Sequence, residues 1–420
     1  MKVETLQARR ENLASQITDG SIVVLLSGTA PKRTADQFYE FAVWRNFLYF
    51  TNIDKPKMAY VMKKSGGTVQ NFLFVDEVPE LEEKWSGVRM RKNVASEISG
   101  IALENVFSFN ELRAIIGKWM ASEALENAYL DFDRTSYNHP DTEQIVFAKE
   151  LGEKYPHLNL RNVYMMIATM RRVKSEEEIT NIRKATTITQ LGIEAMMKAA
   201  KPGMKENEIE AYFDFTVKSA GARDKAFHTI AAAGANATIL HYEDNNANAN
   251  DGDLILFDLG AAWSNYSSDI SRTFPVNGRF TPRQAEIYQA VLDVEKATIE
   301  KIKPGVKMSE LNAFAKQALT DACKKLGLII KDEDVANYYY HTIGHSLGLD
   351  THDVGGREFT LEPGVVITIE PGLYIAEESI GIRIEDDILV TESGYENLSQ
   401  GIIKEIADIE AFMKSSPPMK

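Results

Sequence analysis

The second half of the chain contains a repeat, and this repeat limits the fold more than any other feature. The segment KPGMK at residues 201–205 separates two helix-like stretches, and KPGVK at residues 303–307 does the same further along. Pro-Gly ends the preceding helix in each copy, because proline disrupts a continuing helix and glycine favours a turn. A strand–turn–strand pattern that carries acidic residues follows each copy. The repeat therefore predicts an α+β domain with an internal pseudo-two-fold duplication.

The first part of the chain has a different pattern. A chain of 420 residues exceeds the usual size of one hydrophobic core, so two domains are expected. Short apolar runs at 21–28, 47–53, 58–64 and 71–76 predict strands, and the segment 111–125 predicts a helix. This mixture indicates an N-terminal domain of the α/β class.

The boundary between the two domains is predicted at residues 165–174. Ser175 is followed three residues later by Glu178, which is a capping-box pattern, and Ile179 and Ile182 continue at helical spacing. This pattern marks the start of a helix in the second domain. We therefore expect an N-terminal domain of residues 1–170 and a C-terminal domain of residues 171–420.

Composition excludes several classes of protein. The net charge of −14 argues against a general nucleic-acid binder, which needs a basic face. The chain lacks an apolar run of roughly 18 residues, so a membrane span is not expected. Cys323 is the single cysteine, which excludes an intrachain disulfide and a cysteine-based zinc site. The polar N-terminal segment has no secretion-signal core, so we expect a cytoplasmic protein without nucleic-acid or membrane partners.

Two acids lie in the first strand–turn–strand segment, residues 253–276. Asp258 stands in the apolar run LILFDLG, and Asp269 stands in YSSDISRTF. If the turn centres on residues 263–264, the two aspartates face each other with Cβ atoms about 4.5–5.5 Å apart. Two like charges in this position destabilise the hairpin unless a cation cancels them. A divalent cation is therefore expected beside these strands.

The second segment, residues 364–391, has the same arrangement. Glu370 closes the apolar run VVITI, and Glu385 follows GIRI. A turn centred on residues 377–378 makes these two glutamates neighbours, although Pro371 interrupts ideal pairing on the first strand. The sequence thus pairs two acids twice by the same geometry.

Three of the seven histidines, His341, His345 and His352, fall in the segment 338–353. Glycines in this segment do not favour a helix, and the glutamate of an HExxH motif is missing, so a zinc-helix protease is not expected. Four carboxylates and one imidazole suit two divalent ions, with Mn²⁺ favoured and Co²⁺, Fe²⁺ or Zn²⁺ as alternatives. Two ions about 3.5–4 Å apart bridge a water and convert it to a hydroxide nucleophile.

Several motifs in order resemble the pita-bread metallopeptidase family. They are FDLGAAWSNYSSDISRTF, HTIGHSLGLDTHDVG, TIEPGLYI and GIRIEDDILVT, and within the family they are most similar to aminopeptidase P and next to prolidase. The stretches RRENLASQITDGSIVVLLSG and NFLYFTNIDKP are similar to the aminopeptidase P N-terminal domain. The resemblance implies the creatinase/aminopeptidase pita-bread fold for the C-terminal domain.

The resemblance also implies a metal-ligand set. Asp258 resembles the aspartate that binds one metal ion, and Asp269 and Glu385 resemble the two carboxylates that bridge both ions. His345 and Glu370 resemble the ligands that complete the other ion. Glu370 also resembles a residue that moves the proton of the bridging water.

The other implied residues are catalytic or bind substrate. His241 resembles a histidine of the substrate pocket, and His352 resembles one that contacts the scissile carbonyl or the proline side. His341 resembles the first histidine of the HGxxH segment, although Thr342 replaces its glycine. Arg383 resembles an arginine that supports Glu385 and the substrate site, and Arg357 resembles an arginine near the leaving group.

The activity implied is removal of an N-terminal residue that precedes proline, from proline-containing peptides, by a hydroxide that bridges two metal ions. An Xaa-Pro dipeptidase, a hydrolase of a small amide and a non-catalytic binding protein on the same fold stay open as alternatives. Creatinase keeps the fold without metal ligands, whereas all five ligands are present here. The family also implies a homodimer or higher homo-oligomer. His228 has no motif position, so its role is left open.

Overall fold

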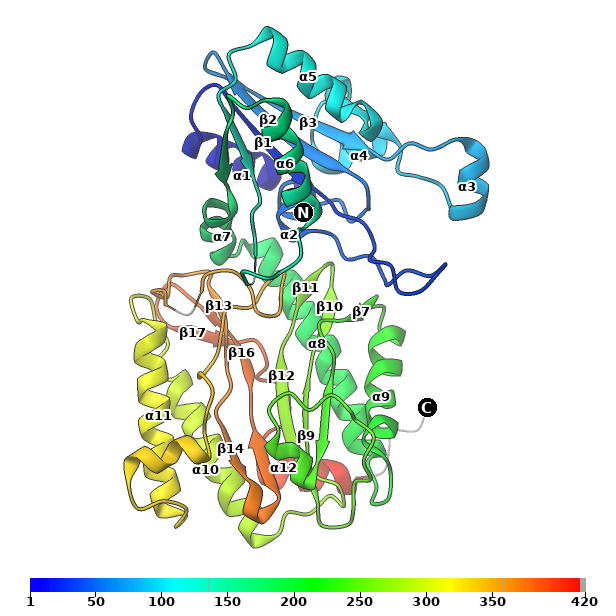
Figure 1. Ribbon diagram of the computed structural model, residues 1–420. Coiled ribbons are helices and arrows are strands. Elements are labelled where there is room, and N and C mark those ends of the chain that lie inside the picture. Colours follow the sequence, from blue (N-terminus) through cyan, green and yellow to red (C-terminus); the bar gives the residue numbers. More distant parts are fainter. Residues whose placement is uncertain (135, 357, 416–420) are drawn as a thin grey trace. The chain divides into compact units, whose positions relative to one another are not determined.

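The computed structural model describes residues 1–134, 136–356 and 358–415, and the chain divides into two compact units, Met1–Arg171 and Arg172–Lys420. Figure 1 shows both units, each with its own strands and helices. Within the described residues, no helix is both long enough and apolar enough to cross a bilayer.

The first unit is built on one six-stranded sheet of order β4-β3-β2-β1-β5-β6. Strands β1, β2 and β3 pair antiparallel, whereas β4, β5 and β6 join in parallel. This mixed sheet with surrounding helices agrees with the predicted α/β class. The strands are β1 (Ser21–Leu26), β2 (Ala59–Ser65), β3 (Thr68–Val75), β4 (Val106–Ser108), β5 (Asn127–Leu130) and β6 (Asn159–Asn162). The helices are α1 (Val3–Gln16), α2 (Arg45–Thr51), α3 (Glu80–Ser86), α4 (Lys92–Ser99), α5 (Leu112–Ser122), α6 (Glu143–Lys154) and α7 (Tyr164–Arg172).

One predicted strand of this unit was wrong. Residues 47–53 fall largely in helix α2, which ends at Thr51 and is capped by Asn52, a residue with a left-handed φ of 54°. Every side chain from Asn46 to Thr51 is buried. A short apolar run that is buried on all sides has no periodicity that separates a helix from a strand, so the sequence pattern was ambiguous here.

In the part of the second unit that the structure describes, four small sheets lie between pairs of helices. The sheets have the orders β11-β10-β7, β12-β9-β8, β13-β16-β17 and β14-β15. In Figure 1, α9 and α11 lie at opposite sides of these strands. The helices are α8 (Glu176–Ala199), α9 (Glu206–Ser219), α10 (Pro282–Ile299), α11 (Met308–Lys325) and α12 (Ile406–Lys414). The strands are β7 (Asp224–Lys225), β8 (Ile230–Ala233), β9 (Leu254–Leu259), β10 (Ala261–Trp263), β11 (Tyr266–Ser267), β12 (Ile270–Pro275), β13 (Val366–Ile369), β14 (Gly372–Ile375), β15 (Ile380–Arg383), β16 (Asp386–Val390) and β17 (Tyr395–Asn397).

The predicted duplication is visible in the two Pro-Gly turns. Gly203 between α8 and α9 has a φ of 91°, and Gly305 between α10 and α11 has a φ of 90°. The amide of Gly203 donates to the carbonyl of Ala249, and the amide of Gly305 donates to that of Leu361. The same residue therefore makes the same bond in both copies, which confirms that KPGxK marks a structural repeat.

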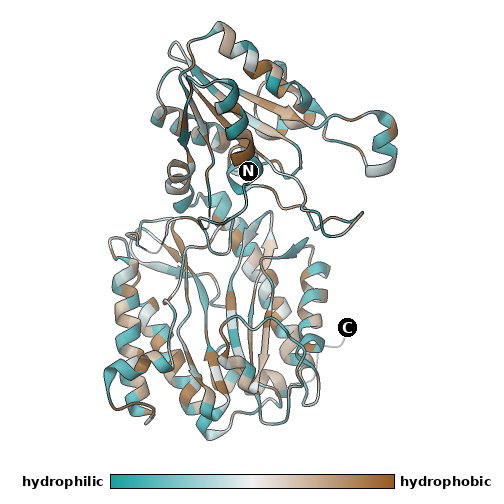
Figure 2. Ribbon diagram, viewed as in Figure 1, coloured by the Kyte–Doolittle hydropathy of each residue, from teal (hydrophilic) through white to brown (hydrophobic). Residues whose placement is uncertain are grey.

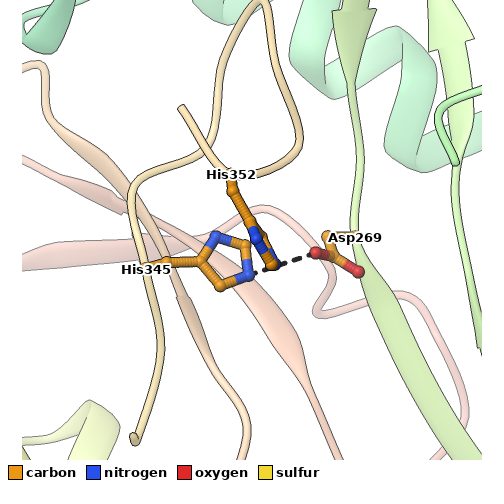
Figure 3. Close-up of side chains that lie close together, drawn as sticks. All are labelled: Asp269, His345 and His352. Carbon is orange, nitrogen blue, oxygen red and sulfur yellow. Dashed lines mark ion pairs between the residues drawn. The ribbon is translucent and has the colours of Figure 1, made fainter. Parts of the chain in front are cut away.

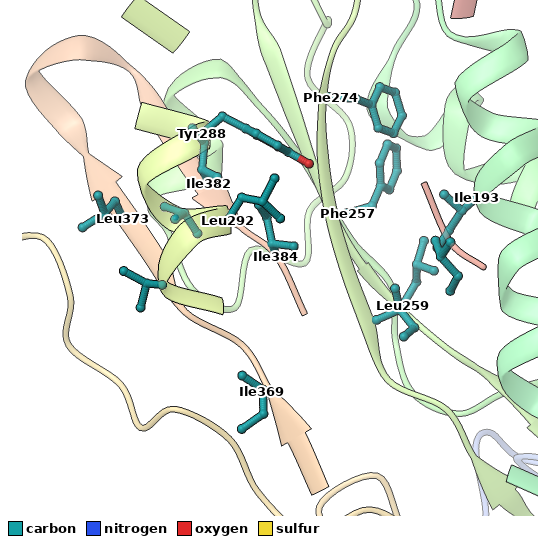
Figure 4. Close-up of a cluster of buried hydrophobic side chains, with 14 of the residues drawn as sticks. Ile193, Phe257, Leu259, Phe274, Tyr288, Leu292, Ile369, Leu373, Ile382 and Ile384 are labelled. Carbon is teal, nitrogen blue, oxygen red and sulfur yellow. The ribbon is translucent and has the colours of Figure 1, made fainter. Parts of the chain in front are cut away.

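The hydrophobic core of the second unit fixes the direction of the acidic side chains. Phe257 and Leu259 of β9 lie in this core, and the ring of Phe257 stacks on Phe274 of β12 (Figure 4). Successive residues of a strand point to opposite faces, so Asp258 points away from the core. Figure 2 shows that the helices carry both hydrophilic and hydrophobic residues, as expected for helices with one face on a core.

Candidate metal centre

The first hairpin brings Asp258 and Asp269 together in a different register from the predicted one. Asp258 of β9 lies opposite Ser271 of β12, so Asp269 stands diagonally to it. The turn centres on Ser264 and Asn265, which have φ values of 51° and 67°. Two consecutive residues with positive φ form the tight turn that suits a twisted hairpin. The predicted turn at 263–264 was therefore one residue too early, and direct opposition of the two aspartates was wrong.

The second hairpin has the predicted register. Ile369 pairs with Asp386, and Gly372 pairs with Arg383, so the same register places Glu370 opposite Glu385 between these two pairs. Pro371 interrupts the ladder here, as expected for a residue without an amide hydrogen. The two glutamates lie between the two pairs of strands, and each offers a carboxylate oxygen to one ligand group with His345.

The two hairpins meet along β12 and β15. The amide of Glu385 donates to the carbonyl of Ser271 at 3.1 Å, and the Ser271 hydroxyl donates to Glu385 Oε2 at 2.8 Å. This contact brings the four acids from both halves of the repeat to one place. Asp258, Asp269 and Glu385 each offer a carboxylate oxygen, and these oxygens lie within 4.8 Å of one another.

His345 joins this group from the loop that runs beside β13. Its carbonyl accepts from the amide of Thr368, and its own amide donates to the Thr368 hydroxyl. His345 Nε2 lies 3.3 Å from Asp269 Oδ2 and 3.7 Å from Glu370 Oε1. Figure 3 shows the His345 ring directed at Asp269, with His352 beside it; the two ring centroids are 4.1 Å apart.

The carboxyl groups of this cluster repel one another. Burial, and then the charge of Glu385, raise the pKa of Asp269 well above its ordinary value. The same two causes raise the pKa of Glu370. Burial and the charge of Asp258 raise the pKa of Glu385 to about 7. In the protein without a bound cation, the cluster therefore retains protons that free carboxyl groups lose well below neutral pH.

This donor set fits two divalent cations. Asp258 Oδ1 is buried without any hydrogen-bond donor among the described residues, and its other oxygen accepts from Arg383. A buried carboxylate oxygen without a donor is costly, and a metal ion satisfies it. Among the ligand groups found, those of His345–Glu370–Glu385 and Asp258–Asp269–Glu385 share Glu385, so two neighbouring ions fit the cluster.

The cluster lines a cavity of about 560 Å³, together with Arg383 and three further histidines. His241, His341 and His352 all border it. Burial, followed by nearby positive charge, lowers the pKa of both His341 and His352 to about 4. Both imidazoles are therefore neutral at physiological pH. Arg357 lies outside the described residues, and His228 does not border this cavity.

Arg383 lies among the acids and is almost fully buried. It donates from Nη2 to Asp258 Oδ2 at 2.7 Å, from Nε to the Ser271 hydroxyl at 2.8 Å and from Nη1 to the Tyr374 hydroxyl at 3.1 Å. The predicted support of Glu385 is indirect, because Ser271 stands between the two side chains. Asp258 is the acid that this guanidinium contacts directly.

Sequence reasoning missed several residues that hold the site together. Asp387 Oδ2 accepts from the Thr186 hydroxyl at 3.1 Å and from the amide of Asp269 at 3.4 Å. Tyr374 bonds both Arg383 and His341 Nε2. The run Glu385-Asp386-Asp387 was a visible signal for Asp387, whereas Tyr374 carries no signal beyond its place in β14.

Comparison with known proteins gives a consistent result. The family model for metallopeptidase family M24 matches residues 180–392, and the model for the aminopeptidase P N-terminal domain matches residues 6–129. The Xaa-Pro aminopeptidase of Escherichia coli is 34% identical over 98% of this chain and 97% of its own.

Solved structures of two relatives are similar to this protein over nearly its whole length. A Bacillus anthracis structure, named provisionally as an aminopeptidase P, is 47% identical with a TM-score of 0.96 and covers 99% of both chains. Aminopeptidase P from E. coli with the inhibitor Pro-Leu is 32% identical with a TM-score of 0.89 and covers 98% of both chains. A zinc-substituted form of the E. coli protein is solved with product.

Proposed function

This chain belongs to metallopeptidase family M24, and we propose that it is a metal-dependent Xaa-Pro aminopeptidase. The observation that supports this most directly is that four acids from two hairpins and His345 from a neighbouring loop meet at one cavity. The relatives named for this activity match along nearly the whole chain.

The ligands would come from both halves of the repeat. We assign Glu385 and Asp269 as the bridging carboxylates. Glu385 belongs to both ligand groups named above, and Asp269 also belongs to a third group, with His345 and His352. Asp258 would complete one ion, and His345 and Glu370 would complete the other. Because oxygen donors dominate this set, Mn²⁺ is the ion we propose, with Co²⁺, Zn²⁺ and Fe²⁺ as alternatives.

When bound, two such ions lower the pKa of a shared water and polarise a carbonyl group. Glu370 would take the proton that the water loses, because its carboxylate lies in the acidic cluster, 3.7 Å from His345 Nε2, and lines the cavity. The nitrogen of the scissile bond must gain a proton to leave as the amine of proline. Glu370 therefore moves one proton from the attacking water to the leaving nitrogen.

The histidines of the cavity would hold the peptide. His341 Nδ1 lies 3.9 Å from Glu370 Oε2, and its Nε2 bonds the Tyr374 hydroxyl at 2.9 Å. His352 and His241 border the space above the acids. Since the pKa of His352 is lowered to about 4, its ring would offer a neutral nitrogen to the peptide, whereas both nitrogens of His341 already contact Thr342 and Tyr374.

An aminopeptidase fits the cavity better than a dipeptidase. A dipeptidase needs a cation for the proline carboxylate, and Arg383 is the one arginine or lysine among the described residues that line the cavity. Its three contacts with Asp258, Ser271 and Tyr374 leave it directed at the protein. We propose that it positions Asp258, while substrate binding by Arg383 or Arg357 stays a prediction.

Hydrolysis of matched peptides tests this function. The protein purified with Mn²⁺ should release the first residue from an X-Pro-Y tripeptide faster than from an X-Pro dipeptide. Cleavage of neither peptide by protein that holds two ions per chain contradicts a peptidase. The binding-protein alternative predicts no bound ions and no turnover, so metal analysis of the same sample separates it. The homo-oligomer and the cytoplasmic location stay predictions, and light scattering tests the former.

A further inference from the structure

One buried lysine, Lys174, connects the two parts of the loop that carries His345 and His352. Its Nζ pairs with Asp353 Oδ2 at 3.1 Å and donates to the Ser346 hydroxyl at 3.3 Å. Ser346 directly follows His345, and Asp353 directly follows His352. A third contact of Nζ, to the carbonyl of Arg172 at 3.1 Å, uses the last donor of the ammonium group.

The surroundings of this ion pair are closed. The side chains of Lys174 and Asp353 are each 1% exposed. Gly348 lies against them so closely that a Cβ there would meet Asp353 Oδ2 at 2.3 Å and Lys174 Cε at 2.9 Å. The backbone closes the same loop, since the amide of Asp353 donates to the carbonyl of Ser346 at 2.8 Å. The residues 346–353 therefore form a small ring with Lys174 on its inner side.

Lys174 itself is held by the strand that leads to the metal centre. Its amide donates to the carbonyl of Gly364 at 2.8 Å, and Val173 forms a β-bridge with Val365. Residue 365 begins the run into β13, which ends beside Glu370. The ammonium group thus has a fixed backbone on one side and the histidine loop on the other.

We propose that Lys174 is a positioning residue that sets the spacing between the imidazoles of His345 and His352. Their ring centroids lie 4.1 Å apart, and the His345 ring is directed at Asp269 (Figure 3). Both rings line the cavity. This inference rests on the proposed function, in which His345 binds metal and His352 contacts the peptide. A buried ion pair adds little net stability, because burial of both charges costs about as much as their attraction returns. We therefore expect this ion pair to fix the positions of the two imidazoles and to add little to the stability of the fold.

The test replaces the pair without leaving a lone charge. In the double variant Lys174→Met/Asp353→Leu, apolar groups of similar size replace both ions, so the unfolding temperature should stay within a few degrees. In the metal-free protein, amide exchange of residues 346–353 should become at least about tenfold faster, while the rest of the unit keeps its rate. With Mn²⁺, kcat on an X-Pro-Y tripeptide should fall roughly 10- to 100-fold.

Lys63→Met is the matched control. Lys63 and Glu123 form another lysine–carboxylate pair with side chains 10% and 24% exposed, in the other unit. Lys63→Met should lower stability and leave kcat unchanged. Wild-type exchange of 346–353 with full kcat in the double variant overturns the positioning role.

A milder variant keeps the inference testable if the double variant does not fold. Ser346→Ala retains both charges and removes one contact of the ammonium, so exchange near residues 346–348 should rise and kcat should fall several-fold. Unchanged exchange and kcat in Ser346→Ala also overturn the proposal. If the wild-type protein hydrolyses no X-Pro peptide, the proposed function fails, whereas the exchange measurement on metal-free protein still decides the role of Lys174.

Discussion

Arg383 donates from Nη2 to Asp258 Oδ2 at 2.7 Å, and this contact joins β15 of one half of the repeat to β9 of the other. The guanidinium lies beside the cluster of four acids, of which Asp269 and Glu385 are buried and Asp258 and Glu370 are half-buried. Its other donors bond Ser271 and Tyr374, so these two bonds fix the orientation of the guanidinium that contacts Asp258. The ammonium group of a lysine cannot reproduce the planar arrangement of donors in this guanidinium.

Arg383→Lys should therefore lower kcat roughly 10- to 100-fold, since the lysine keeps the charge but cannot contact Asp258, Ser271 and Tyr374 together. Metal content per chain should stay near that of the wild type. Steady-state kinetics and elemental analysis of the same sample measure both. Arg283→Lys is the control, because Arg283 pairs with Glu286 and Glu378 away from the cavity. Full activity of Arg383→Lys contradicts the positioning of Asp258 by the fork.

Asp269→Ala should abolish binding of both ions. Asp269 belongs to two ligand groups, so loss of its carboxylate weakens both sites together. Calorimetric titration with Mn²⁺ should show no tight two-ion binding, and hydrolysis should be undetectable. Asp251→Ala, at an exposed position before β9, should bind Mn²⁺ as the wild type does. Two ions and full turnover in Asp269→Ala would mean that Asp269 is not a bridge.

The metal-free protein should become less stable as pH rises from about 5 to about 7.5. Burial and the charge of Asp258 raise the pKa of Glu385 to about 7, against about 4.3 in an unfolded chain. A carboxyl group with a raised pKa in the folded protein binds a proton there more tightly than in the unfolded chain. The stability that this group contributes is complete at pH values below its pKa in the unfolded chain. It is lost as pH rises past its pKa in the folded protein, and the loss in free energy of unfolding is on the order of 3 kcal/mol.

Scanning calorimetry in a chelator across this pH range measures the effect. Saturating Mn²⁺ should remove the loss of stability, because bound cations favour the ionised carboxylates. Glu385→Gln should flatten the profile of the metal-free protein. A metal-free unfolding temperature that rises between pH 5 and pH 7.5 would be the opposite of this expectation.

Sequence patterns predicted the layout of this unit because the turns carry their own chemistry. Pro-Gly at 202–203 and 304–305 requires a helix end in any context, so the repeat was readable without a structure. The register of the second hairpin was also predictable, because the acidic turn and the two apolar runs leave one symmetrical pairing.

The parts that were missed depend on tertiary contacts. Ser264 and Asn265 both adopt positive φ, and Ser is not a strong signal for that conformation, so the first turn was placed one residue early. Helix α2 is buried on every side, so its run of apolar residues has no period. Asp387 acts through Thr186, and Lys174 acts through Asp353. These partners lie far away in the sequence, so a local sequence pattern does not reveal either contact.

His352→Ala should lower kcat while two ions stay bound. Its ring borders the cavity beside His345, and its pKa, lowered to about 4 by burial and by His345, makes it a neutral group at the peptide. Kinetics together with elemental analysis should show a loss of turnover at constant metal content. His228→Ala is the control, since His228 is exposed and does not border the cavity. Loss of metal in His352→Ala would instead make His352 a ligand.

Gly344→Ala should displace His345 and so weaken metal binding. A Cβ on Gly344 would stand 1.9 Å from the carbonyl oxygen of Thr368, which is backbone of β13 and has no room to move. The added methyl group must push the loop away from the strand, and His345 follows Gly344 directly. Its bonds to Thr368 would then lengthen, and Nε2 would leave the acids. Calorimetric titration should show Mn²⁺ affinity reduced by at least about tenfold. Gly394→Ala, where a Cβ meets nothing within 4 Å, should bind Mn²⁺ normally, and normal binding by Gly344→Ala as well would show that the loop position does not govern the centre.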